Sequence, residues 1–229
     1  MKKYELTDEI KLYNGRTLHR IVALRNFGNV EIGDKGGWIE KEDNLSHAGF
    51  CWVYDNAQVY DNAKVCNNAK VWGNAQVCSN ANVRGNAIVM DNAEVGDNAQ
   101  VWGNAIVRDK AQIYGNAKVW GDANVCGNAN VRGNAQVYDN AEVWGNAKVR
   151  GDAEIYNNKD YIVFKNWWSS GRYFTWTRSN NMWSVGCFYG TGDELIKKAY
   201  ADNEDKGKHY AEIVEYVNKC VIGIKTNNK

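Results

Sequence analysis

Three histidines are the side chains of this 229-residue sequence best suited to acid–base chemistry. A catalytic general base needs a partner that orients it and a substrate within reach. Of His19, His47 and His209, only His47 has suitable neighbours in the sequence, because Ser46 precedes it and Asp43 lies close by. The sequence therefore assigns no catalytic residue, and His47 is the one candidate worth testing.

The six cysteines offer a second kind of chemistry, metal binding or disulfide formation. They form no C-x-x-C motif and have no regular spacing, so we expect reduced thiols. The three histidines lie far apart in the sequence, which disfavours a histidine metal site. We predict no metal site and no cofactor.

Charge and hydropathy narrow the function classes further. Lys plus Arg number 28 and Asp plus Glu 27, a net charge of +1, which argues against a dedicated nucleic-acid-binding protein. No apolar run is long enough to span a membrane, and the start MKKYELTDEIK lacks the apolar core of a signal peptide. We expect a cytoplasmic protein.

A hexad repeat occupies the centre of the chain and must position any functional side chain. An aliphatic residue recurs every six positions, eighteen times, from Val53 to Ile155, and Ala follows four residues later from Ala57 to Ala153. In Ala-x-Val-x the period of two places Ala and Val on one face, towards a narrow core. The Gly-Asn and Asp-Asn pairs supply corners, because these residues tolerate a left-handed backbone. Three hexads close a triangular coil, and the eighteen hexads make about six regular coils.

This array, in stretches such as VYDNAQVYDNAKV and VWGNAKVRGDAEIYNN, resembles the left-handed parallel β-helix of hexapeptide-repeat proteins over residues 53–158. The resemblance implies the left hand; many members of that family are acyltransferases and many are homotrimers. The segments LHRIVALRNFGNV, GDKGGWIE and GCFYGTGDEL, with the VxGNA array, are also similar to uncharacterised proteins encoded by bacteriophages. That likeness implies viral origin, hence a host cytoplasm, and supplies no reaction.

The flanks of the array complete a mainly β fold. Residues 1–52 are expected to form an N-terminal β-hairpin cap, turning at Asn14-Gly15, and an irregular first coil in which Val53 follows Leu45 after a two-residue slip. Residues 159–229 are expected to form a small α+β module. It should have three strands, a helix capped by the T-x-x-E box of Thr191 and Glu194, and a second helix after Gly207.

One outward face of the coils carries an apolar patch on an otherwise polar wall, made of Trp72, Ile88, Met90 and Ile106. Exposed apolar patches usually mark interfaces. We expect this patch to join copies of the chain, and family habit suggests a homotrimer. The alternative is that the patch is covered by a terminal segment of the same chain.

The other two faces carry candidate binding groups, each with a structural alternative. Rings stacked from coil to coil could bind bases, sugars or a protein, or could simply stabilise neighbouring coils. A basic cluster on the third face could bind a phosphate or remain a solvated charged surface. The rings belong to Trp102, Trp120, Tyr138 and Tyr156, and the basic cluster contains Arg132, Lys148 and Arg150.

The C-terminal module has aromatic and basic residues in its turns, among them Trp167, Trp168 and Arg172. Such residues suit recognition of a partner. The alternative is that the tryptophans, with Trp176 and Trp183, form the core of a small module.

Together these features favour a non-catalytic, oligomeric β-helix scaffold that binds a ligand or partner. In a phage setting the target would be a host defence protein or a small signalling nucleotide. An acyltransferase using acyl-CoA and His47 is the first alternative. It is weakened because no histidine lies within the hexads and no long loop interrupts them. A structural virion component is the second alternative.

Overall fold

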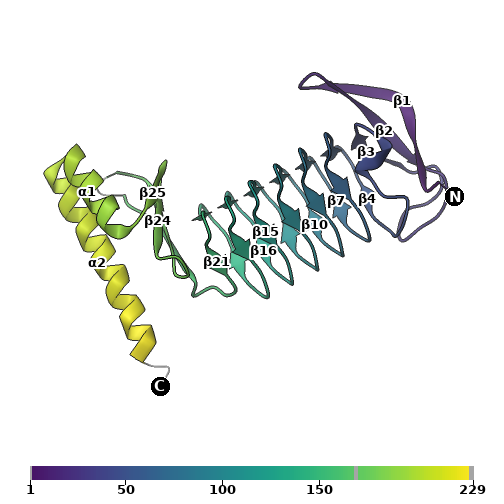
Figure 1. Cartoon of the computed structure of the whole chain (residues 1–229). Coiled ribbons are helices and arrows are strands. Elements are labelled where there is room, and N and C mark those ends of the chain that lie inside the picture. Colours follow the sequence, from purple (N-terminus) through teal and green to yellow (C-terminus); the bar gives the residue numbers. More distant parts are fainter. Residues whose placement is uncertain (1, 168–169, 227–229) are drawn as a thin grey trace. The chain divides into compact units, whose positions relative to one another are not determined.

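The computed structural model describes residues 2–167 and 170–226, which form two compact units, Met1–Asp160 and Tyr161–Lys229. The first unit is a parallel β-solenoid of seven turns, and the second is a four-stranded antiparallel sheet with two helices (Figure 1). The mainly β fold expected from the repeat is confirmed. None of the helices in the described residues is long and apolar enough to cross a membrane.

Three walls of short parallel strands form the solenoid, one strand per wall in each coil. Almost all these strands have two residues, the second being the aliphatic residue of the hexad. The patch wall comprises β4 (Trp52–Val53), β7 (Lys70–Val71), β10 (Ile88–Val89), β13 (Ile106–Val107), β16 (Asn124–Val125) and β19 (Glu142–Val143). The ladder wall comprises β6 (Lys64–Val65), β9 (Asn82–Val83), β12 (Gln100–Val101), β15 (Lys118–Val119), β18 (Gln136–Val137) and β21 (Glu154–Ile155). The polar wall comprises β3 (Lys35–Ile39), β5 (Gln58–Val59), β8 (Gln76–Val77), β11 (Glu94–Val95), β14 (Gln112–Ile113), β17 (Asn130–Val131) and β20 (Lys148–Val149).

The core is the narrow prism between these walls. Every hexad Ala and every aliphatic hexad residue is at most 1% exposed. From β4 onwards each strand pairs with the strand eighteen residues further along, as in Val89 with Val107, so identical positions stack along the axis. A small and a medium side chain per strand fill the prism, which explains why the repeat varies so little at these two positions.

The first coil joins the same stack, although two of its three pairs are twenty rather than eighteen residues apart. Ile39 pairs with Val59, Leu45 with Val65 and Val53 with Val71. The two-residue slip before Val53 is therefore an insertion within a real coil, as expected. A short 3₁₀ helix, η1 (Glu42–Asn44), lies within it.

The N-terminal hairpin extends the polar wall by two strands. Strands β1 (Tyr4–Tyr13) and β2 (Arg16–Ala23) are antiparallel and joined at Asn14 and Gly15, both with positive φ. Strand β2 pairs with β3, which in turn pairs with β5 of the solenoid (Figure 1). The turn predicted from Asn-Gly is confirmed, and β1 becomes the edge strand of a nine-stranded sheet.

The C-terminal unit differs from expectation in its number of strands and in the start of its second helix. Its sheet has four strands rather than three, in the order β22 (Tyr161–Lys165), β23 (Tyr173–Thr177), β24 (Met182–Val185) and β25 (Phe188–Gly190). The stretch MWSVGCFYG turns back on itself because Gly186 adopts a φ of 58°. Trp176 and Trp183 are buried in its core, against Leu195 and Val214 of the helices.

The first helix, α1 (Gly192–Asp202), begins with the predicted capping box of Thr191 and Glu194. The second, α2 (Glu204–Thr226), starts earlier than predicted and includes Gly207. The glycine lies where a Cβ atom would come within 2.3 Å of the Tyr200 ring, so it permits close helix contact rather than ending a helix. His209 accordingly lies inside α2, not at its start.

The corners of the coils are held by hydrogen bonds between asparagine side chains. The residue before each corner Asn has positive φ, for example Asp97 at 52° and Gly115 at 71°. The amide of Asn98 donates to Asn116 over 3.1 Å, and that of Asn116 donates to Asn134 over 3.0 Å. These ladders give a reason for Asn at the hexad corner beyond its tolerance of turns.

We expect Asn116→Ala to lower the free energy of unfolding by about 1–3 kcal/mol, because it removes two ladder hydrogen bonds. Asn128→Ala is the matched control, since Asn128 occupies an equivalent corner with no ladder bond described. Urea denaturation followed by circular dichroism measures both. Equal losses for the two variants would contradict a stabilising role for the ladder.

Candidate functional site

His47 is held by contacts that suit packing rather than base catalysis. Its Nδ1 accepts a hydrogen bond of 3.2 Å from the backbone N–H of Lys3, so the proton of the neutral ring lies on Nε2. Nε2 is 4.0 Å from Glu42 Oε2, and the ring stacks on Tyr4 with a centroid distance of 4.4 Å. Burial lowers the pKa of His47, which disfavours the protonated ring. In this tautomer neither ring nitrogen offers a free lone pair to a substrate.

The other two histidines have surroundings of their own. The Nδ1 atom of His19, on β2, is 3.2 Å from the Thr7 carbonyl oxygen. His209 lies on α2 in the other compact unit, beside a cavity lined partly by Phe164 and Tyr216. No group of three or more His, Cys, Asp or Glu side chains among the described residues could hold a metal ion.

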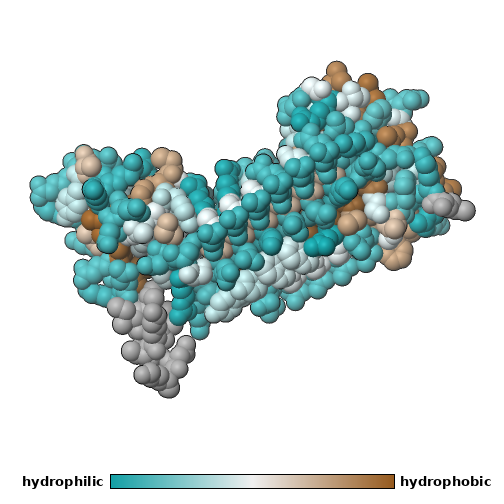
Figure 2. Space-filling view, viewed as in Figure 1, coloured by the Kyte–Doolittle hydropathy of each residue, from teal (hydrophilic) through white to brown (hydrophobic). Residues whose placement is uncertain are grey.

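A cavity of about 300 Å³ opens where the first coil meets the patch wall; we call it the first-coil cavity. Loop residues from the first coil form one side, and the second and third coils form the other. Its lining residues are Gly28, Asn29, Phe50, Tyr54, Asn68, Lys70, Asn86 and Ile88. Apolar residues gather at this end of the solenoid, while its walls are mostly hydrophilic (Figure 2).

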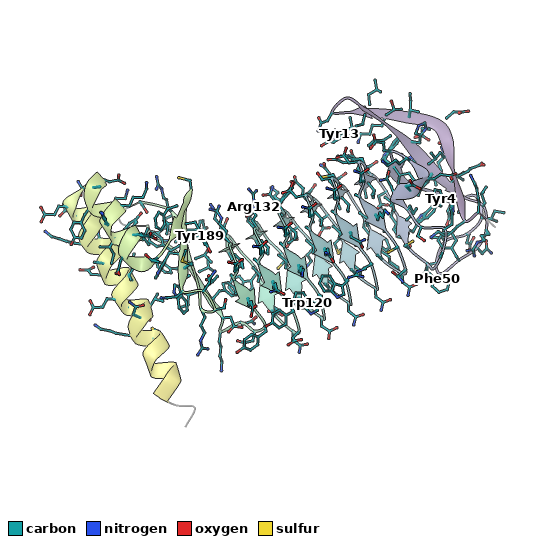
Figure 3. All side chains as sticks on the ribbon, viewed as in Figure 1. Tyr4, Tyr13, Phe50, Trp120, Arg132 and Tyr189 are labelled. Carbon is teal, nitrogen blue, oxygen red and sulfur yellow. The ribbon has the colours of Figure 1, made fainter. Side chains whose placement is uncertain are left out.

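Two aromatic rings give the first-coil cavity its apolar surface. Phe50 is 54% exposed and lies at the first-coil end of the solenoid (Figure 3). The Tyr54 ring stacks on Trp72 with centroids 3.9 Å apart and an angle of 10° between the planes. Burial raises the pKa of the Tyr54 hydroxyl, so it remains a neutral hydrogen-bond donor at physiological pH.

Lys70 supplies the cavity with a positive charge. Its Nζ is 5.9 Å from the centre of the Trp72 ring, and within the described part of the chain no carboxylate lies within ion-pair distance. The neighbouring amides are already engaged, since Asn68 donates to Asn86 over 3.1 Å and accepts from the Phe50 N–H. The arrangement suits an anion attached to a planar or apolar group.

The apolar patch borders this cavity. Ile88 and Ile106 are paired neighbours in the patch wall, and Met90 and Trp72 occupy outward positions beside them. Ile88 is shared between the patch and the cavity lining. Any chain that covers the patch would also border the cavity.

The rings of Trp102, Trp120, Tyr138 and Tyr156 form what we call the aromatic ladder. The faces of the first three rings cover one another. Trp102 and Trp120 are 5.0 Å apart with planes 3° apart, and Trp120 and Tyr138 are 4.6 Å apart with planes 7° apart. The Tyr156 ring follows at 6.1 Å but is tilted by 34° and is 49% exposed, and the Arg84 guanidinium lies 5.2 Å from the ring centre of Trp102 at the other end. A base or sugar needs a free ring face, so this geometry favours the structural interpretation of the ladder.

The basic cluster of the polar wall is tied into a hydrogen-bond network. Arg132 donates to Gln112 over 3.3 Å, and its guanidinium lies 5.3 Å from the centre of the Tyr114 ring. The Tyr114 hydroxyl donates to Glu94 over 2.6 Å. Lys148 and Arg150 belong to the neighbouring coil. Trp120 and Arg132 point to different sides of the solenoid, so the ladder and the basic cluster are separate surfaces (Figure 3).

In the C-terminal unit, Trp167 is 73% exposed and the Lys165 ammonium lies 3.5 Å from its ring centre. Arg172 is exposed and its side chain runs beside Gly186. Trp168 lies outside the described residues. Trp167 and Arg172 thus remain candidates for recognition, whereas Trp176 and Trp183 belong to the core.

Sequence reasoning missed most of the first-coil cavity. Its candidates included Ile88 but not Phe50, Tyr54 or Lys70. Tyr54 and Lys70 could have been found, because they occupy outward positions of the patch wall. Phe50 could not, because it lies in the irregular loop whose path no repeat determines.

No protein-family model matches the chain. Over 63 residues it is 35% identical to the Uncharacterized acetyltransferase YdcK of Escherichia coli (strain K12), covering 24% of this chain and 19% of that protein. The chain therefore matches only about a fifth of the length of this relative. The solenoid itself is that of a β-helix repeat protein.

We expect Trp120→Ala to lower the free energy of unfolding by about 1–3 kcal/mol, because both faces of this ring are stacked. Lys118→Ala, which changes an exposed residue two positions before Trp120, should cost less than about 0.5 kcal/mol. Urea denaturation compares the two. If Trp120→Ala is as stable as Lys118→Ala, the ladder does not hold the coils together and a binding role regains support.

Proposed function

We propose that this chain is a non-catalytic, oligomeric β-helix scaffold that binds a small anionic molecule in the first-coil cavity. The observation that carries the proposal is Lys70, a cation without a described carboxylate partner, in a cavity bordered by Phe50 and Tyr54. A cavity of about 300 Å³ is at the small end for ligand sites. It suits one planar group, with the rest of the ligand outside.

Oligomerisation fits the same site. The patch around Ile88 and Ile106 is the surface that a second copy of the chain would cover, and a homotrimer is the arrangement expected from the hexapeptide-repeat resemblance. Because Ile88 lines the cavity too, a neighbouring copy would border its open side. Ligand binding and assembly would then support each other.

The resemblance to phage-encoded proteins adds the biological setting. In this proposal the chain is a viral protein in the host cytoplasm, and its ligand is a small nucleotide signal that it removes from a host defence. A nucleotide combines a planar base with a phosphate, which is the combination that Lys70 and the two rings would recognise. A host protein bound through Trp167 and Arg172 is the other partner compatible with a scaffold.

The local similarity to an acetyltransferase favours a second candidate, acyl transfer from acyl-CoA. Acyl-CoA also carries a planar base and phosphates, so it would suit the same cavity. The tautomer of His47 argues against that residue as the base, and a catalytic role would need another group. A structural virion component remains a third candidate, tested by mass spectrometry of purified particles.

We expect Lys70→Gln to weaken nucleotide binding about tenfold, roughly 1.4 kcal/mol, because it removes the cation that faces the phosphate. Isothermal titration with nucleoside mono- and diphosphates, and separately with acetyl-CoA, measures the effect. Lys64→Gln, an exposed lysine of the ladder wall, is the matched control and should bind normally.

Two results would contradict this proposal. Wild-type protein that binds none of these anions would remove the cavity as their site. Turnover of acetyl-CoA with an acceptor would replace the scaffold with the acyltransferase. Native mass spectrometry of the protein as purified complements the titration, because a retained ligand adds its own mass to the oligomer.

We expect Ile106→Glu to dissociate the oligomer at micromolar concentration, because it places a charge within the patch. Size-exclusion chromatography with light scattering gives the mass in solution. Gln100→Glu, at the same hexad position of the ladder wall, should leave the oligomer intact. A monomeric wild-type protein would overturn the interface altogether.

A further inference from the structure

A buried lysine lies against a buried cysteine beneath the N-terminal hairpin. Lys3 is 0% exposed, and its Nζ donates hydrogen bonds to the Cys51 carbonyl oxygen over 2.7 Å and to Cys51 Sγ over 3.2 Å. The Phe27 ring is its other close neighbour, 5.0 Å from the ammonium. Across the described residues, no carboxylate lies within ion-pair distance of this amine. A buried ammonium without an acid is unfavourable, so burial increases the share of neutral amine.

The sulfur is held just as closely. Cys51 is 0% exposed, and its Sγ lies 3.4 Å from the Ser46 carbonyl oxygen and 3.7 Å from that of Ala48. The thiol proton can be donated to either carbonyl, which leaves a sulfur lone pair directed at Lys3. Burial lowers the pKa of Lys3 and raises that of Cys51, so both groups are driven towards their neutral forms.

We propose that Lys3 and Cys51 form a reversible covalent nitrogen–sulfur link when hydrogen peroxide oxidises the thiol. In the first step the sulfur attacks peroxide, the O–O bond breaks, and a sulfenic acid and one water are formed. In the second step the neutral amine attacks sulfur, the S–O bond breaks, and hydroxide leaves with the amine proton as a second water. The two side chains lose two hydrogens in total, and peroxide is the species reduced.

The first oxidation of Cys51 is slow, and the short distance between Lys3 and Cys51 then favours the second step. A buried neutral thiol reacts slowly with peroxide, and local opening of the edge strand β1, which contains the neighbouring Tyr4, would admit it. Once the sulfenic acid forms, the amine 3.2 Å away is its nearest nucleophile. Cys187 is exposed and has no such lysine described against it, so it should oxidise to sulfinic acid instead.

The link would fasten the start of the chain to the first coil. Cys51 directly follows Phe50, so the cross-link would fix the backbone next to the first-coil cavity. The inference does not depend on what that cavity binds. Its immediate consequence is a more stable hairpin, since a cross-link between residues 3 and 51 restricts the unfolded chain.

The test is peptide mass mapping of the full-length protein treated with hydrogen peroxide in its native state. We expect a cross-linked pair of peptides, one containing Lys3 and one containing Cys51, with about 2 Da less than their summed mass. Treatment with a thiol reductant should separate them. The melting temperature should rise on oxidation and fall back on reduction.

Two variants and one unfolded control keep the test decisive. Lys3→Met should abolish the link and leave Cys51 to oxidise further. Cys51→Ser should abolish the link and any oxidation at residue 51. If either variant fails to fold, wild-type protein oxidised in urea serves instead, because the link should form only in the native state. A native Cys51 sulfinic acid with free Lys3, or a link that retains an oxygen atom, would overturn the reaction.

Discussion

The eighteen-residue register between coils is the constraint on which the rest of this structure depends. Backbone N–H groups of each strand and corner bond to the next coil, as Gln58 does to Ala75, and this keeps hexad positions stacked on their equivalents, as with Val89 and Val107. The register can persist only if every corner turns within the same number of residues, and each corner does so with a left-handed residue followed by a polar one. Ala and Val then follow from the width of the prism. The sequence repeats because every coil has the same corners and the same narrow core.

The same constraint limits where function can arise. A perfect stack brings like side chains together, and the result is ladders of rings and amides that satisfy one another, such as Trp102 on Trp120 and Asn98 on Asn116. Their hydrogen-bonding groups and ring faces are already used. The first coil is the main interruption of this register, and the first-coil cavity opens there. Lys70, a cation without a described carboxylate partner, faces that interruption.

The sequence predicts this fold well because its energetics are local and repeated. Period six, the corner residues and the Ala and Val positions settle the walls, the register and even the two-residue slip before Val53. Prediction from the sequence fails where a single residue decides a turn or a contact. Gly186 divides an expected strand into two, and Gly207 lies inside α2, where it leaves room for the Tyr200 ring. The candidate site was only partly predictable for the same reason. Ile88 follows from the repeat, whereas Phe50 depends on a loop path that no periodicity encodes.

The irregular first coil also explains why unusual chemistry is concentrated at one end of the solenoid. The coil with the insertion is covered by larger buried side chains than Ala and Val, namely Lys3, Tyr4 and Trp52, and Trp52 packs against Tyr4 and Phe27. Lys3 lies at this end of the solenoid, and the first coil offers its amine the carbonyl oxygen and the sulfur of Cys51 as hydrogen-bond acceptors. The hairpin, the Lys3–Cys51 contact and the first-coil cavity are therefore linked consequences of ending a regular stack. A change in the contact between Lys3 and Cys51 would affect the position of Phe50, since Phe50 directly precedes Cys51 in the chain.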